Sequence, residues 1–496
     1  MRTFYMICSV LIIVMRGLNG YAATPVDEFE AARMRLFLVQ QSAVPGVMNY
    51  EQIGLTSMTD VSWREVPGLY WNNTTYHLER VEWSGFNLSG SLDVSDFTGL
   101  RNLYVHFNDL KLVNVRNCTS LINLDLYEND LSEIDVSTNP ALLYMRLGYN
   151  HIRFVDISNN PNLMFLCCTE NQVETLDISN HEWLETVYCI GNGMQTLLVD
   201  NCTNLEILLC SQNELKSLNM YNLPSLIKFT CFYNSLNELR FFNCTSLVDI
   251  DCSFNEITTL DVSTCEKLTT LDCTNNQLES INIAGCNRLT KLTCRNNQLT
   301  SLDISKTPSL STLFCTFNKL SLLTLPPDKP PLTTYSYSPQ QNITMKSKYD
   351  QVDFSEFYKI EGQTTSFIWR NRYTVVRPLE SHEGRFAFSE SYIGDSLTCL
   401  MQNNFFPLLW MQYVVKFTEN DDSGNDNPAI GQPVVYAGEA AIHITTVTPA
   451  VVSIYSLQGA LQLKKTVSAG YSRFVVERGI YVVVVNDTSS YKVIVR

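Results

Sequence analysis

Apolar and polar positions repeat with a period of 21 residues over about half of the chain. One asparagine returns at this interval without a slip, and a leucine stands thirteen residues after each of the first ten asparagines. The series is Asn108, Asn129, Asn150, Asn171, Asn192, Asn213, Asn234, Asn255, Asn276, Asn297 and Asn318. Two further apolar columns follow, as Leu302 and Ile304 follow Asn297. The pattern predicts stacked coils, each of which buries its apolar columns against its neighbours.

A coil of this length has room for one short strand and a return segment, so successive strands should form one long sheet. With strands about 4.8 Å apart, roughly eleven or twelve coils make a sheet on the order of 55 Å long. The asparagines are expected to turn inward where each strand ends and to bond free backbone groups there. This assigns them to the scaffold and not to catalysis.

Cysteine forms a second regular column, three residues before the asparagine in eight consecutive coils: Cys168, Cys189, Cys210, Cys231, Cys252, Cys273, Cys294 and Cys315. Val105, Leu126 and Leu147 hold this position in earlier coils, so the position is apolar. Another column, ten residues after the asparagine, alternates cysteine with Asn139, Asn160 and Thr307. Buried thiols behave as small hydrophobes, so we expect free thiols, with disulfides or a metal site as open alternatives.

The unit L-x-x-L-x-C-x-x-N-x-L, followed by x-x-L-x-V/I and a polar turn, resembles the leucine-rich repeat. It is most similar to the 21-residue repeats of exported Bacteroidetes proteins and to internalins. The resemblance implies a mainly β fold built on a right-handed leucine-rich repeat solenoid over residues 86–327. It also implies that the inner, concave curve displays the residues six, four, two and one positions before each asparagine.

The N-terminal part should contain an export signal and a small helical cap. Residues 1–22 have a positive start, a short apolar run and small residues before a cleavage point after Ala22, as in a signal peptide. Residues 23–85 are predicted to cap the solenoid. In this cap, a helix with Thr24 as its N-cap would bury a stripe of Phe29, Ala32, Leu36 and Val39.

Three tryptophans, Trp63, Trp71 and Trp83, are expected to fill the cap. The next segment, 78–98, fits the repeat only in a frame one residue earlier than the asparagine count, with Phe86 and not Asn87 in the asparagine position. We therefore expect an irregular first coil.

Two β-domains are expected after the solenoid. Residues 330–419 resemble an immunoglobulin-like β-sandwich, with Trp369 and Cys399 in its core but without the disulfide of that family. Residues 420–430 are a polar linker. Residues 431–496 resemble the C-terminal sorting domain of type IX secretion cargo, which implies contact with that secretion machinery. The residues that carry this resemblance are Ile454, Tyr455, Gly459, Gly479, Ile480, Tyr481, Lys492 and Val493.

The net charge and the lack of known catalytic motifs argue against several classes of function. The formal net charge of −15 argues against nucleic acid as a partner. Motifs of hydrolases, zinc proteases and nucleotide-binding loops are missing, and the six histidines are scattered. The sequence therefore predicts no enzyme, no cofactor and no metal site. After the export signal, no apolar run is long enough for a transmembrane helix.

In the regular coils, the positions assigned to the concave face carry short polar residues, as at Thr270 and Asp272. In earlier coils, the same positions carry aromatic or basic residues. The candidate ligand-binding residues are Tyr104, His106, Tyr127, Tyr144, Arg146, Tyr149, Phe165, Tyr188, Phe232 and Tyr233. Exposed Tyr, Phe and Arg are typical of binding hot spots. Packing of the sheet, or docking of the chain's own cap, is the alternative explanation for the stripe.

The sequence thus favours an exported adhesion or binding protein at the cell surface or outside the cell, with a protein ligand on the concave face. A glycan is a less favoured ligand. A self-assembling surface or matrix component stays open. A carbohydrate-active enzyme also stays open, and it would need two converging carboxylates, for which Asp125 and Glu128 are the candidates near the aromatic residues.

Overall fold

The structure is a computed structural model that describes residues 25–328, 332–348, 351–418, 434–438, 441–446, 450–456, 460–467, 470–476, 479–486 and 489–495. The predicted signal peptide (1–22) and the predicted linker (420–430) lie outside these residues. The chain divides into two compact units, Met1–Gln341 and Asn342–Arg496. None of the helices in the described part is long and apolar enough to cross a membrane.

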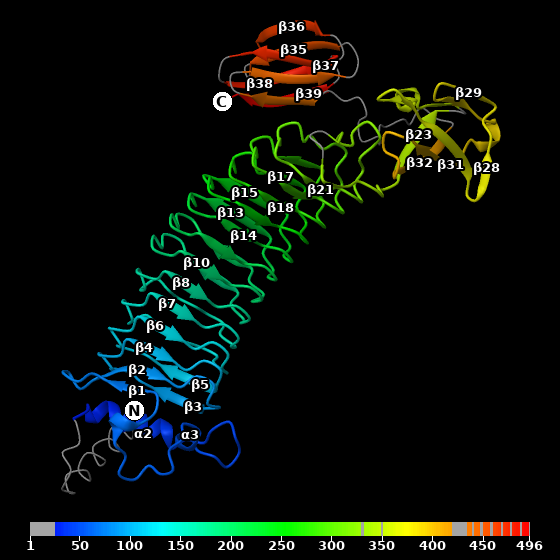
Figure 1. Cartoon of the computed structure of the whole chain (residues 1–496). Helices are drawn as coiled ribbons and strands as arrows, with labels where there is room; N and C mark the ends of the chain where they lie inside the picture. Colours follow the sequence, from blue (N-terminus) through cyan, green and yellow to red (C-terminus); the bar gives the residue numbers. More distant parts are fainter. Residues whose placement is uncertain are drawn as a thin grey trace. The chain divides into compact units, whose positions relative to one another are not determined.

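One long sheet runs through the first unit (Figure 1). Its strands, in spatial order, are β1 (Leu69–Trp71), β2 (Leu78–Glu82), β4 (Asn102–Tyr104), β6 (Asn123–Asp125), β7 (Tyr144–Arg146), β8 (Phe165–Cys167), β10 (Thr186–Tyr188), β12 (Ile207–Leu209), β14 (Lys228–Thr230), β16 (Asp249–Asp251), β18 (Thr270–Asp272), β20 (Lys291–Thr293), β21 (Thr312–Phe314) and β22 (Thr334–Ser336). The predicted mainly β solenoid is confirmed.

The pairing register reproduces the sequence period. In the interior, partners are 21 residues apart, as Val187 pairs with Leu208 in parallel strands. At the two ends the offset is 22, because Val81 pairs with Leu103 and Leu313 with Tyr335. The first offset agrees with the expected frame shift of the first coil. The second belongs to a further coil that continues the sheet beyond residue 327, the end of the solenoid that the sequence predicts.

Shorter parallel pairs line another side of the coils. They are β3 (Ser89–Asp93) with β5 (Asp109–Asn114), β9 (Thr175–Asp177) with β11 (Thr196–Leu198), β13 (Ser217–Tyr221) with β15 (Glu238–Phe242), and β17 (Thr259–Asp261) with β19 (Ser280–Asn282). Between these pairs and the long sheet, the leucine columns and the two cysteine columns of the solenoid are buried. We call the surface on this side of the coils the outer side.

The asparagine series forms a hydrogen-bonded ladder from coil to coil. Asn255 shows the pattern: its Nδ2 donates to the carbonyls of Cys231 (3.0 Å) and Cys252 (3.1 Å), and its Oδ1 accepts the N–H of Leu236 (3.0 Å). The buried N–H of Leu236 finds its partner in this way. Each of the two carbonyls is shared with the asparagine of a neighbouring coil, Asn234 at Cys231 (3.0 Å) and Asn276 at Cys252 (3.0 Å). The predicted structural role of the asparagines is confirmed.

The column ten residues after the asparagine is a second ladder. Its side chains bond a carbonyl 24 residues earlier: Cys118 Sγ donates to Val94 (3.0 Å), Asn160 Nδ2 to Val136 (3.0 Å) and Cys202 Sγ to Ile178 (2.8 Å). His181 joins the same column, with Nε2 3.0 Å from the carbonyl oxygen of Ile157. Cysteine alternates with asparagine here because both donate, so these thiols are more than the apolar fillers that the sequence predicted.

All fifteen cysteines of the described residues are free and buried. Burial raises the pKa of the Cys118 and Cys210 thiols to about 12, because the apolar interior disfavours the charged thiolate. Buried thiols of this kind are structural and unreactive.

The cap helix differs from its prediction. Helix α2 (Glu28–Leu38) starts after Asp27, whose side chain accepts the N–H of Glu30 (3.0 Å), so the N-cap is Asp27 and not Thr24. The expected apolar stripe is wrong as well. Phe29, Leu36 and Val39 are about half exposed, and α2 instead buries Glu30, Ala31, Met34, Phe37 and Leu38. Packing against the first coil, and not the apolar spacing alone, selects this face.

The rest of the cap packs around the predicted tryptophans. Helix α3 (Asn49–Gln52) and the 3₁₀ turn η1 (Trp63–Glu65) complete it. Trp83 is fully buried and stacks on Phe37, with ring centroids 5.8 Å apart. Trp71 is also buried, whereas Trp63 is half-buried. The cap therefore closes the apolar interior of the first coil.

The second unit begins with two sheets. One contains β23 (Ile343–Lys348), β32 (Trp410–Thr418), β31 (Ser396–Gln402), β27 (Ser366–Asn371) and β28 (Thr374–Val376), and the other β24 (Gln351–Asp353), β30 (Arg385–Ala387) and β29 (Glu380–His382). A small pair, β25 (Lys359–Ile360) with β26 (Gln363–Thr364), and the 3₁₀ turns η2 (Ser355–Phe357) and η3 (Glu390–Tyr392) complete it. Trp369 and Cys399 are buried cross-strand partners. The immunoglobulin-like assignment stays a prediction.

The last residues form two further sheets, β33 (Val434–Gly438), β34 (Ala441–Thr446) and β37 (Gly470–Val475), and β36 (Leu461–Val467), β35 (Ala450–Ser456), β38 (Gly479–Val485) and β39 (Ser489–Val495). Ile442, Ile454 and Val483 are among the residues of their apolar core. The C-terminal β region is thus present, and its role in sorting stays a prediction.

Candidate ligand-binding face

The long sheet presents one row of solvent-facing side chains per coil, which we call the sheet face. It consists of the residues six, four, two and one positions before each ladder asparagine. The ten predicted residues all lie here, and each is half-buried or exposed. Tyr104, Tyr144, Arg146, Phe165 and Tyr188 lie on strands, and His106, Tyr127, Tyr149, Phe232 and Tyr233 lie just after them.

An aromatic cluster occupies the first coils of this face. The ring centroids of His106 and Phe107 are 5.0 Å apart, those of Phe107 and Tyr127 5.7 Å, and those of Tyr127 and Tyr149 5.2 Å. The guanidinium of Arg146 lies 5.2 Å from the centre of the Tyr127 ring. These side chains therefore form one continuous surface, which we call the first cluster.

Asp125 lies beneath the first cluster and orders it. Its side chain is 8% exposed, and its Oδ2 contacts Arg146 Nη1 (3.0 Å) and His106 Nδ1 (3.3 Å). Its Oδ1 accepts the N–H of Tyr127 (3.2 Å). A buried carboxylate needs such partners, so Asp125 positions the basic side chains. It is already engaged, whereas Glu128 is exposed, and this is unlike the two free, converging carboxylates that the carbohydrate-active alternative requires.

Further aromatic residues continue along the face. Phe165 and Tyr188 are 5.5 Å apart in an edge-to-face contact. Phe232 contacts Tyr233 (5.9 Å), which stacks on Phe254 at 4.3 Å. Phe254 was not among the predicted residues, although it stands one position before Asn255, where the sequence pattern could have found it.

Several aromatic residues of the face stand where the backbone disfavours them. The residue before each ladder asparagine has a positive φ, close to +55° at Phe107, Tyr149, Tyr233 and Phe254. Asparagine and glycine suit this left-handed conformation, and bulky side chains raise its energy. The regular coils indeed use asparagine there, as at Asn275. Aromatic residues at these positions lower the local stability of the backbone. Residues that are retained at such a cost are typical of functional sites.

Three aspartates, Asp249, Asp251 and Asp272, lie on the sheet face in the coils after the predicted aromatic residues. Burial raises the pKa of Asp251, opposed by hydrogen bonds from the hydroxyl and N–H of Ser253 and assisted by the nearby charges of Asp272 and Asp249. The sequence did not predict this acidic group, because aspartate at these positions matches the polar residues of the regular coils.

The raised pKa of Asp251 predicts a pH effect. The folded state holds this proton more tightly than the unfolded chain, so its contribution to stability is lost as pH rises from about 4 through the raised pKa. Asp251→Asn keeps the acceptor for Ser253 but carries no charge. We expect urea denaturation to show a gain of stability for Asp251→Asn over the wild type at pH 7 that shrinks at pH 3. The control is Asp261→Asn at an exposed position where the aspartate likewise accepts a backbone N–H, that of Ser263. An equal gain at both pH values would contradict the assignment.

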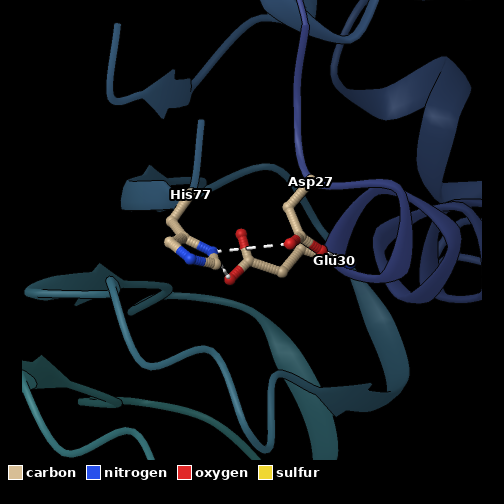
Figure 2. A group of neighbouring side chains, drawn as sticks. All are labelled: Asp27, Glu30 and His77. Atoms are coloured by element: carbon tan, nitrogen blue, oxygen red, sulfur yellow. Dashed lines mark hydrogen bonds and ion pairs between the residues drawn. The ribbon is translucent and has the colours of Figure 1, made fainter. Parts of the chain in front are cut away.

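A second polar group lies in the cap, away from the sheet face. Within the described residues, Asp27, Glu30 and His77 bring potential metal-ligand atoms within 4.8 Å of one another (Figure 2). Glu30 is buried, accepts the N–H of Leu78 through Oε2 (2.6 Å) and contacts His77 Nδ1 through Oε1 (3.0 Å). Asp27 caps the helix and lies 3.6 Å from His77 Nδ1.

These bonds join helix α2 to the start of strand β2, so we interpret the group as a clamp between the cap and the first coil. Burial raises the pKa of Glu30, opposed by the hydrogen bond from Leu78 and by His77. The sequence did not predict this group, because Asp27 and His77 are far apart along the chain.

Comparison with solved structures finds leucine-rich repeat proteins. The functional domain of InlJ from Listeria monocytogenes, described as including a cysteine ladder, is 22% identical, with a TM-score of 0.42, over 66% of this chain and 90% of that one. YopM from Yersinia enterocolitica is 26% identical (TM-score 0.41) over 52% and 59%. The leucine-rich repeat domain of APL1B is 20% identical (TM-score 0.41) over 55% and 90%. No protein-family model and no curated protein matches the chain.

Proposed function

We propose that this chain is an exported, non-catalytic binding protein that holds a protein ligand against the sheet face at the cell surface or outside the cell. The observation that carries the proposal is the row of aromatic side chains at positive φ, which are retained although asparagine suits those positions better. Rigid aromatic residues beside an arginine supply contact area at low entropic cost and are enriched in hot spots. The signal-like residues 1–22 and the sorting-like residues 431–496 support export.

The first cluster itself favours a ligand over mere sheet packing. Phe107 and Tyr149 of the cluster are 50% and 47% exposed, and Tyr144, on strand β7, is 43% exposed, so their rings still have apolar surface to bury. The central residues of the strands beneath the cluster, Leu103, Leu124 and Met145, are at most 1% exposed and already supply the packing of the sheet there. A partner that covers the aromatic rings would gain about 25 cal/mol per Å² of apolar area.

The test removes aromatic side chains but leaves the Asp125–Arg146 ion pair intact. In Tyr127→Ala/Tyr149→Asn/Tyr188→Ala, the asparagine introduced for Tyr149 suits the positive φ of that position, so we expect a melting temperature within a few degrees of the wild type. With the full chain as bait for cell-surface extracts, quantitative mass spectrometry should show at least a tenfold loss of the captured partner. The control Thr270→Ala/Lys291→Ala/Thr312→Ala changes the bland coils of the same face. A partner that both variants retain would overturn the proposal.

A further inference from the structure

An open pocket of about 500 Å³ lies on the outer side of the solenoid, between two successive coils. Its walls come from residues 154–161 of one coil and 175–183 of the next, and we call it the outer pocket. Its lining includes Phe154, Asp156, Asp177, His181, Glu182 and Trp183. The pocket shares no residue with the sheet face.

Two large aromatic side chains line the outer pocket and depart from the repeat. Phe154 is 66% exposed and Trp183 58% exposed. The residues one coil before and after Phe154 are Glu133 and Thr175, and those beside Trp183 are Asn162 and Asn204. A single exposed aromatic residue on a surface needs no explanation, but two departures from the pattern that meet in one pocket point to a ligand.

The position of Trp183 has a structural use in the neighbouring coils. Asn162 donates to the carbonyl of Pro140 (3.1 Å) and Asn204 to that of Glu182 (2.8 Å), each 22 residues earlier. Trp183 stands at the position where the coil before it and the coil after it each have an asparagine that makes this coil-to-coil bond. As on the sheet face, a residue that suits the fold has been exchanged for an exposed aromatic one.

The polar lining of the outer pocket is acidic. Asp156 accepts the N–H of Ser158 (2.9 Å), and this bond and the Ser158 hydroxyl lower the pKa of Asp156, so it is ionised at neutral pH. Asp177 accepts the N–H of Ser179 (2.9 Å) in the same way, and Glu182 adds a third carboxylate. Among the described residues, the ion pairs of the solenoid involve other carboxylates, such as Asp130 and Asp249.

The ring nitrogens of His181 face the backbone. Its Nε2 lies 3.0 Å from the carbonyl oxygen of Ile157, and its Nδ1 lies 3.2 Å from that of Ile178. A single N–H of the imidazole donates to one of these two carbonyls. The outer pocket combines exposed aromatic rings with carboxylates that lack a basic partner in the described structure, and this combination attracts an organic cation.

We propose that the outer pocket binds a basic peptide segment, with an arginine or lysine side chain against Trp183 and Phe154 and its charge beside Asp156, Asp177 and Glu182. The guanidinium suits such a site because it stacks on aromatic faces and bonds carboxylates at the same time. This second site is independent of the ligand proposed for the sheet face.

The test uses the full chain and a fluorescently labelled hexapeptide of alternating arginine and serine, followed by fluorescence anisotropy. We expect saturable binding that weakens as salt rises and that falls at least tenfold when citrulline replaces arginine, since citrulline keeps the shape but not the charge. Trp183→Ala, and separately Asp156→Asn/Asp177→Asn, should each lower the affinity at least tenfold. All these side chains are exposed, so circular dichroism and the melting temperature should match the wild type.

Two control variants locate the site. Phe242→Ala removes another exposed aromatic ring of the outer side (64% exposed) and should leave the affinity unchanged. The sheet-face triple variant should also retain it, which separates this proposal from the first one. Equal binding of the arginine and citrulline peptides, binding unaffected by Trp183→Ala, or no binding at all would overturn the proposal. So would Trp183-dependent binding of a neutral glucose hexasaccharide without binding of the arginine peptide.

Discussion

Replacing Asn150 by alanine is expected to lower the free energy of unfolding by about 2–4 kcal/mol. The Nδ2 of Asn150 donates to the carbonyls of Leu126 and Leu147 (both 2.9 Å), and its Oδ1 accepts the N–H of Leu131 (3.0 Å). Alanine leaves the buried N–H of Leu131 without a partner, which costs about 1–3 kcal/mol. It also removes one hydrogen bond, worth about 0.5–1.5 kcal/mol, from each carbonyl, whose other side-chain donors are Asn129 at Leu126 (3.1 Å) and Asn171 at Leu147 (3.0 Å). Urea denaturation followed by circular dichroism measures the change.

The matched control for Asn150 lies in the same coil. Asn159 is exposed, and its side chain makes one long contact of 3.4 Å with Ser158 Oγ, so Asn159→Ala should change stability by less than about 0.5 kcal/mol. Equal effects of the two variants would show that the asparagine ladder does not hold the coils together.

Alkylation of the buried cysteines by iodoacetamide at pH 8 is expected to be about a thousandfold slower in the native protein than in urea. The thiolate is the reactive form. A pKa of about 12, as for Cys118 and Cys210, lowers the thiolate fraction at pH 8 by about three powers of ten relative to an ordinary thiol. Peptide mass spectrometry over a time course measures the rate at each cysteine.

An exposed reference thiol calibrates this experiment. Ser301 is exposed, so Ser301→Cys should react in the native protein as fast as in urea. Rapid native modification of Cys210 would contradict the buried free-thiol ladder. A cysteine that stays unmodified even in urea until a reductant is added would reveal a disulfide.

The interior coils could be predicted from the sequence because every coil meets the same neighbours. A leucine, a cysteine or an asparagine at a given position has one environment, so the period alone indicates what is buried. The ten sheet-face residues followed from the same count, and all lie where it placed them. The contacts between their side chains, and the role of Asp125 beneath them, depend on rotamers that a periodic pattern does not specify.

The ends of the solenoid are different because there the environment changes from one coil to the next. Gln340 takes the asparagine position in the last coil, where its Oε1 accepts the N–H of Asn318 (3.1 Å) and its Nε2 donates to the carbonyl of Cys315 (2.9 Å). The offset of 22 residues hid it from a search with a period of 21. In the cap, buried Glu30 replaces the expected apolar contact because Leu78 and His77 supply its hydrogen bonds.

The asparagine and thiol ladders join each coil to the one directly before it. A gene segment that encodes one 21-residue unit could therefore be lost or duplicated, and the new neighbours would still offer the same carbonyls and N–H groups to each other. Such a change lengthens or shortens the protein without a new core having to arise. Evolution can in this way adjust the length of the sheet face independently of its chemistry.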